Sequence, residues 1–153
     1  MKALHFLFKT DNSLSTLILR VMLGTIFFPH GAQKALGWFG GYGFEGTMGF
    51  FTGTMHIPTV FALLAITAEF AGSIGLILGC CTRIAAFGIA SVMIVAAQVH
   101  APNGFFMNWM GNQKGEGIEY SLLALTIAVA LILLGGGPLS VDRAISKSLP
   151  AAN

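Results

Sequence analysis

Four long apolar runs dominate the chain, and shorter stretches rich in glycine or polar residues separate them. A helix needs about 20 mostly apolar residues to cross the hydrocarbon core of a bilayer. Runs of this kind predict membrane-spanning helices at about residues 14–36, 57–79, 82–100 and 118–135. The expected fold class is therefore all-α, with residues 1–153 forming a single membrane domain, an integral membrane four-helix bundle.

Local signals mark the ends of these predicted helices. Asn12 or Ser13 can cap the first, because their side-chain oxygens accept hydrogen bonds from free N–H groups. Pro58 suits the first turn of the second helix, where its missing N–H does no harm. Residues 135–138, Gly-Gly-Gly-Pro, should end the fourth.

The composition supports a membrane protein. Hydrophobic residues make up 55% of the chain and charged residues only 9%, against about 25% charged in ordinary soluble domains. The formal net charge of +2 gives no reason to expect nucleic-acid binding. The two cysteines, Cys80 and Cys81, are adjacent, and adjacent cysteines rarely pair because the geometry is strained. We expect neither a disulfide framework nor a metal site.

The distribution of lysine and arginine predicts the orientation of the chain in the membrane. These residues are enriched in cytoplasmic loops. With four crossings, both termini lie on one side of the membrane. That side carries Lys2, Lys9, Arg83, Arg143 and Lys147, and the other side carries Lys34 and Lys114. Both termini are therefore expected in the cytoplasm, with the loops 37–56 and 101–117 facing outward.

Both outer loops are rich in glycine and aromatic residues and almost free of charge. Trp and Tyr favour the headgroup zone of a bilayer. We expect residues 44–54 to form a short helix or re-entrant piece on the outer end of the bundle. Two roles remain open for it, an interfacial anchor or a lid over a cavity.

Several ionisable side chains fall inside the predicted spans. At about 1.5 Å of rise per residue, Glu69 lies near the midplane and Arg20 in the cytoplasmic half. An unpaired charge at a helix centre costs at least about 2.5–3.5 kcal/mol on insertion scales, so Glu69 should pair with Arg20 or contact His30. Residues from three helices fall in the outer half and are expected to converge there: His30, Lys34, Gln98, His100 and Glu119.

Each of these residues also has a purely structural interpretation. Lys34 can extend to the interface and Arg20 to lipid phosphates, because their long stems allow the charged head to reach polar surroundings. His100 and Glu119 can be ordinary solvated residues beside a loop. Glu69 is too short to reach the interface from the midplane, so it is either half of a buried structural pair or part of a functional site.

The order of these features resembles the DoxX family of small bacterial membrane proteins. The resemblance rests on LRVMLGTIFFPHGAQKALGWFG, AEFAGSIGLILGCCTRIAA, HAPNGFF and GEGIEYSLLALTIAVALILLGGGPLSVDRAI, and it spans roughly residues 14–146. It implies a four-helix, multi-pass protein of the bacterial inner (cell) membrane. The family's name comes from a small subunit of a quinol oxidase and thiosulfate:quinone oxidoreductase system, and other members are associated with quinone or thiol stress.

The first functional hypothesis is a redox-associated subunit that binds a quinone or a small sulfur compound in the outer half of the bundle. The expected catalytic residues are Glu69, His30 and His100, because a histidine with a carboxylate can supply protons near neutral pH. The expected substrate-binding residues are Arg20, Lys34, Gln98 and Glu119. We expect no tightly bound cofactor other than a quinone, and a haem between His30 and His100 is disfavoured. The sequence lacks a nucleotide-binding fingerprint, so electrons would come from a partner or a small reductant.

Two other hypotheses remain. The protein can be a non-catalytic accessory or assembly subunit of a membrane oxidoreductase complex, with the polar residues holding the bundle together. It can also transport protons or a small solute along its titratable groups. The expected partners are the lipid bilayer, another oxidoreductase subunit or further copies of the chain.

Overall fold

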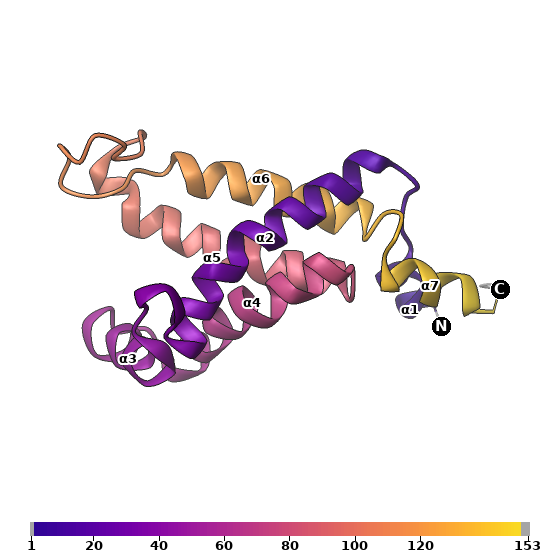
Figure 1. Ribbon diagram of the computed structural model, residues 1–153, viewed down its shortest axis with the longest axis horizontal. Helices are drawn as coiled ribbons and strands as arrows, with labels where there is room; N and C mark the ends of the chain where they lie inside the picture. The colour runs from indigo at the N-terminus through magenta and orange to yellow at the C-terminus, as the bar shows by residue number, and fades with distance from the viewer. Residues whose placement is uncertain (1, 151–153) are drawn as a thin grey trace.

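The structure is a computed structural model that describes residues 2–150, except for the side chains of residues 2–4, and this part contains helices and no strand. The α-helices are α1 (Lys2–Phe8), α2 (Leu14–Leu36), α3 (Gly43–Gly49), α4 (Thr59–Leu78), α5 (Thr82–His100), α6 (Glu119–Leu134) and α7 (Val141–Ser148) (Figure 1). A π-helical segment, Phe50–Thr54, follows α3, and short 3-10 turns occupy Trp38–Gly40 and Ala101–Asn103. The expectation of an all-helical chain is confirmed over the described residues.

The four long helices coincide with the four predicted spans to within two residues at each end. Ser13 caps α2, with its side chain accepting a hydrogen bond from the Ser15 N–H at 3.2 Å. By length and composition, α2, α4 and α5 can cross a membrane. The fourth helix, α6, is apolar but has only 16 residues, which is shorter than the roughly 20 that a full crossing needs.

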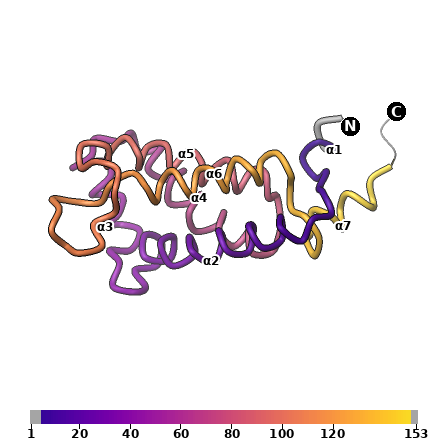
Figure 2. Tube along the Cα trace, turned by 90° about the horizontal axis from the view of Figure 1, so that it is seen from above, coloured from indigo at the N-terminus to yellow at the C-terminus, as the bar shows by residue number. Residues whose placement is uncertain are grey.

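The long helices form a closed set of neighbours. Helix α2 packs on α4, α4 on α5, α5 on α6, and α6 returns to α2. Helices α1 and α7 contact each other at one end of the molecule, hereafter the terminal end (Figure 1). Figure 2 shows α3 and the loop between α5 and α6 at the opposite end, hereafter the loop end. Helices α1 and α7 therefore lie at the same end of the long helices.

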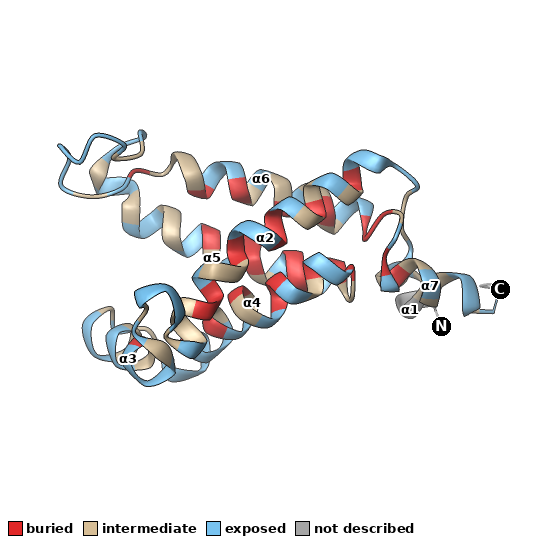
Figure 3. Ribbon diagram, viewed as in Figure 1, coloured by how far each residue is buried: buried red, intermediate tan, exposed pale blue. Residues whose placement is uncertain are grey.

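A narrow apolar core lies between the long helices. Its fully buried members come from α2, α4, α5 and α6, and they include Phe27, Leu76, Ile89 and Leu131. Only 28–33% of each candidate span is buried, and Figure 3 shows exposed and intermediate stretches along all four long helices. Large apolar residues such as Phe61, Phe87 and Leu133 are among the exposed ones. Such all-round hydrophobicity is typical of helices whose outer faces meet lipid.

Helices α2 and α4 approach each other most closely at two glycines of α2. A Cβ atom on Gly31 would lie 2.5 Å from the Cα of Phe70 and 2.6 Å from the carbonyl oxygen of Glu69. A Cβ atom on Gly24 would lie 2.8 Å from the carbonyl oxygen of Ser73. Only glycine permits this backbone contact, which is how small residues bring membrane helices together.

Arg20 organises the terminal end. Its side chain is 1% exposed, and its Nε donates to the carbonyl of Gly136 at 2.8 Å. Its Nη1 donates to the carbonyls of Leu76 at 2.7 Å and Ile77 at 2.6 Å, and its Nη2 to Leu139 at 3.1 Å. The guanidinium thus neutralises the free carbonyls at the negative end of the α4 dipole. Arg20 is not the partner of Glu69, because these carbonyls occupy it.

Asp142 caps the start of α5 from the far end of the chain. Its two carboxylate oxygens accept hydrogen bonds from the N–H groups of Cys81 at 2.7 Å and Thr82 at 2.8 Å. Cys80 and Cys81 are free and half-buried in the turn between α4 and α5. Burial raises the pKa of the Cys81 thiol, and Cys80 and Asp142 raise it further. The Asp142 cap therefore closes the hairpin of α4 and α5. With its raised pKa, the Cys81 thiol stays protonated at neutral pH.

The close contact at Gly31 generates a stability prediction. Gly31→Ala places a methyl group against the α4 backbone and should lower the free energy of unfolding by roughly 1–3 kcal/mol, as overpacking does. Denaturation in detergent micelles measures the loss. The matched control is Gly53→Ala in the π-helical segment, where no atom lies within 4 Å of the new Cβ. Equal stability of the two variants would contradict the close contact.

Candidate functional site

An ion pair between Lys34 and Glu69 links α2 to α4 in the loop-end half of the bundle. The Glu69 side chain is 5% exposed, whereas that of Lys34 is 27% exposed. Lys34 lies in the last turn of α2, three residues after Gly31. This spacing puts the two residues on nearly the same face of the helix. The backbone contact at Gly31 brings the Lys34 stem close enough to reach the carboxylate from the end of α2.

His30 and Tyr120 extend this ion pair into a cluster from three helices. His30 lies one turn before Lys34 on α2, and both Lys34 and Glu69 act on its imidazole electrostatically. Tyr120, in the first turn of α6, has its ring centroid 6.3 Å from that of His30. We call His30, Lys34, Glu69 and Tyr120 the polar cluster. The expected partners of Glu69 were Arg20 and His30, but the structure pairs it with Lys34. His30 is near enough for the Glu69 charge to act on it.

The phenol of Tyr120 has an unusual environment. Its Oη is buried, and no group in the described part of the chain hydrogen-bonds to it. The Glu69 carboxylate is near enough to influence the phenol electrostatically, and the ring stacks at 6.1 Å on Phe27. Buried hydroxyls nearly always have a partner, so this phenol is an exception within the described chain.

The sequence pattern predicts a role for Glu119, whereas the residue that lies against His30 is its neighbour Tyr120. A usable signal was present, because Tyr120, Ala124 and Ala128 recur at four-residue spacing and the two alanines are buried in α6. In the structure the Oε2 of Glu119 accepts a hydrogen bond from the Met107 N–H at 3.2 Å. Glu119 therefore orders the outer loop, while Tyr120 faces the bundle.

The remaining predicted site residues lie outside the polar cluster. Gln98 is exposed near the end of α5, and His100 is half-buried as its last residue. No hydrogen bond or ion pair among residues 5–150 connects either of them to the cluster. Arg20 belongs to the terminal end, where backbone carbonyls occupy its guanidinium. The structure thus brings together three of the seven predicted residues, His30, Lys34 and Glu69.

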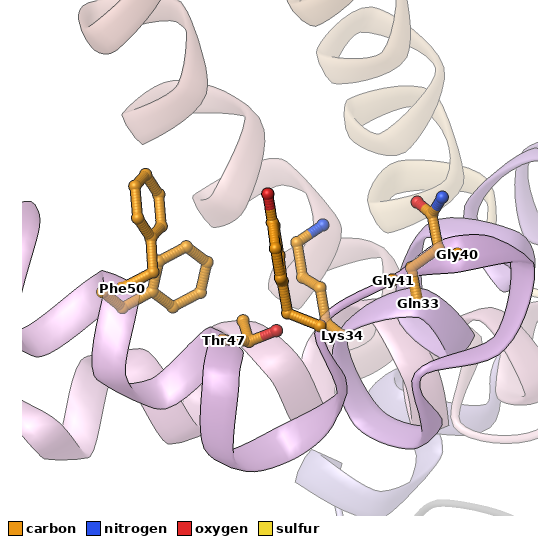
Figure 4. A pocket seen from close by; sticks show the side chains of 8 residues that line it. Gln33, Lys34, Gly40, Gly41, Thr47 and Phe50 are labelled. Carbon is orange, nitrogen blue, oxygen red and sulfur yellow. The ribbon is translucent and has the colours of Figure 1, made fainter.

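A cavity of about 290 Å³ adjoins the cluster at Lys34. Figure 4 shows the side chains of Lys34 and Phe50 on either side of Thr47 in this cavity. Its lining comes from the end of α2, the glycine turn after it, α3 and the π-helical segment: Gln33, Lys34, Gly40, Gly41, Tyr42, Thr47, Phe50 and Phe51. The segment 44–54, expected as a short helix, is helical and forms a wall of this cavity.

The polar cluster combines an amine, a carboxylate, an imidazole and a phenol. These groups can donate and accept hydrogen bonds and exchange protons with a bound molecule. The described residues contain no group of three or more His, Cys, Asp or Glu side chains placed to hold a metal ion.

The ion pair predicts a coupling that a double-mutant cycle measures. Lys34→Met and Glu69→Met should each lower the free energy of unfolding by about 2 kcal/mol, because each leaves one charge without its partner. The double variant should recover about 1–2 kcal/mol of the summed loss, since both charges are then gone. Additive losses in detergent denaturation would contradict a direct pair.

Comparisons with known proteins identify a family for this chain. The family model that matches this chain is DoxX, over residues 15–109. A protein of Bacillus subtilis (strain 168), described as "Putative oxidoreductase CatD", is 31% identical over 143 residues, which cover 92% of this chain and 93% of that protein. No solved structure matches the chain at a significant level. The matched region covers α2, α4 and α5 and includes the Lys34–Glu69 pair. The chain therefore belongs to the DoxX family of membrane proteins.

Proposed function

We propose that this protein is a redox-associated subunit of the bacterial inner membrane that binds a quinone or a small sulfur compound at the polar cluster. The similarity to a protein described as an oxidoreductase supports a redox role. The observation that carries the proposal is the Lys34–Glu69 pair near His30, because its Lys34 member also lines the 290 Å³ cavity. Ionisable groups at such depth in a membrane protein mark functional sites by default.

The proposed topology has four crossings with both termini in the cytoplasm. Contact between α1 and α7 at the terminal end supports an even number of crossings, so α6 serves as the fourth. Its 16 residues reach about 24 Å, and the flanking glycine turn and outer loop complete the distance. The polar cluster then lies in the half of the bilayer that faces away from the cytoplasm.

The residues suit a two-electron, two-proton reduction of a quinone to a quinol. The exposed His30 imidazole would relay both protons from water to the ring oxygens. The Lys34 ammonium, held by the ionised Glu69 carboxylate, would donate a hydrogen bond to the oxygen on which negative charge develops. The two electrons come from a partner protein or from a small reductant. The protein's own contribution is binding, orientation and proton supply.

The test removes the charges while keeping the fold. Lys34→Met/Glu69→Met in lipid nanodiscs should weaken binding of a short-tailed benzoquinone at least about tenfold, the equivalent of one charged contact of about 1.4 kcal/mol. Calorimetric titration and quinone-reduction assays with an added reductant measure the effect. Thr67→Val, on the exposed face of α4, is the control and should bind as the parent does. Unchanged binding in the double variant would contradict the proposal.

A second candidate is a non-catalytic accessory or assembly subunit, and the loop between α5 and α6 favours it. Glu116 orders this loop, its Oε2 accepting from the Asn108 N–H at 2.8 Å and its backbone carbonyl accepting from Asn103 at 3.0 Å. At the tip, Trp109 is 83% exposed and Met110 is 88% exposed. An ordered loop that presents large apolar side chains suits docking to a partner subunit.

This candidate predicts loss of a partner rather than of ligand binding. Trp109→Ser should reduce the yield of a co-purified subunit by about tenfold or more, because losing a hot-spot tryptophan costs about 2 kcal/mol or more. Quantitative mass spectrometry of tagged protein from native membranes measures the yield. His30→Ala serves as control and should leave the yield unchanged. An undiminished yield from Trp109→Ser would dismiss the accessory role for this loop.

A further inference from the structure

We infer that Cys80 and Cys81 form a two-thiol site that binds a monosubstituted trivalent arsenical, R–As(OH)2, at the terminal end of the protein. This site lies in the turn between α4 and α5, whereas the polar cluster lies in the loop-end half of the bundle. The inference is therefore independent of the proposed function. The class of ligand follows from the number of thiols, their exposure and the charges around them.

The two thiols are free and lie next to each other. Both cysteines are partly exposed, so a small molecule can reach them from the surface of the protein. Burial raises the pKa of the Cys81 thiol, and Cys80 raises it further by its charge and by a side-chain hydrogen bond, which requires the two side chains to be in contact. Closing adjacent cysteines into a disulfide is strained, so both thiols stay available to a ligand that bridges them.

Hydrogen bonds fix the backbone of this turn before any ligand binds. The N–H of Cys80 donates to the carbonyl of Gly75 at 2.8 Å, and the N–H of Cys81 donates to the Oδ1 of Asp142 at 2.7 Å. The carbonyl of Gly79 accepts from the N–H of Asp142 at 2.9 Å. A ligand that bridges both thiols therefore orders little additional backbone, and preorganisation of this kind strengthens binding.

The number of thiols selects the ligand. Among the described residues, no third His, Cys, Asp or Glu side chain joins the pair to form a metal-binding group. A structural zinc site needs four such ligands. A monosubstituted arsenical has two exchangeable hydroxyl groups, one for each cysteine, whereas inorganic arsenite has three and would keep one unreplaced.

The surroundings favour an uncharged product. Cysteine binds metal ions as a thiolate, and burial, Cys80 and Asp142 all raise the pKa of the Cys81 thiol, which disfavours that form. When the arsenical binds, two As–O bonds break and two As–S bonds form, and each thiol proton leaves with a hydroxyl group as water. Arsenic remains trivalent and the adduct carries no charge, so the step needs neither an oxidant nor a buried thiolate.

The experiment uses phenylarsine oxide, which hydrates to the R–As(OH)2 form, and the full chain in nanodiscs. The parent should bind one molecule per chain. The dithiol 2,3-dimercaptopropanol should release it at concentrations at which the monothiol 2-mercaptoethanol does not. Cys80→Ser and Cys81→Ser should each weaken binding about 100-fold or more, because the second attachment is no longer intramolecular. Native mass spectrometry measures the occupancy.

The matched control keeps two cysteines in the chain but separates them. Cys80→Ser/Ser91→Cys places the second thiol on the exposed face of α5, about 15 Å along the helix from Cys81. This variant should bind phenylarsine oxide as weakly as Cys80→Ser does. Zinc ions and arsenite, added separately to the parent, should bind more weakly than phenylarsine oxide.

Each measurement can overturn one part of the inference. Equal affinity of the parent and Cys80→Ser, or equal release by the two thiol reagents, overturns the two-thiol site. Tight binding by Cys80→Ser/Ser91→Cys overturns the role of the turn, and tighter binding of zinc or arsenite overturns the class of ligand. Release is measured on the parent alone, so it decides the question even if a variant fails to fold.

Discussion

The contact between the backbones of α2 and α4 at Gly31 is the constraint on which the candidate site depends. A side chain at this position would overlap the backbone of Glu69 and Phe70. Because the helices touch here, Lys34 reaches Glu69 from the last turn of α2. The same contact leaves His30, on the adjoining surface of α2, facing Tyr120 of α6. The absence of a side chain at Gly31 thus sets the distance between α2 and α4 at the polar cluster.

The two ends of the bundle use buried charge in opposite ways. At the terminal end Arg20 and Asp142 bind backbone groups, which closes the ends of α4, α5 and α6 into one rigid unit. At the loop end the charges bind each other, and a cavity adjoins them. Side chains that are fully occupied by the backbone stabilise a fold. Side chains that bind each other beside a cavity can exchange partners, which is the property that a ligand site needs.

Stability alone gives a weak reason for the Lys34–Glu69 pair. A buried ion pair loses its hydration, and apolar residues of similar volume are often equally stabilising. In a chain with only 9% charged residues, two of them meet inside the bundle next to an imidazole and an unpaired phenol. Stability alone therefore accounts poorly for this arrangement.

The sequence by itself determined the helices, while the tertiary structure decided which side chains meet. The apolar runs predict the bounds of α2 and α5 correctly, because a helix in lipid must satisfy its own backbone. The rise per residue correctly places Glu69 inside a long helix. Depth leaves the rotation of each helix about its axis undetermined. The rotation of α6 directs Tyr120 toward the bundle and Glu119 toward the loop. The side chains of Arg20 and Lys34 are long enough to reach several groups, so helix packing decides which partner each one binds.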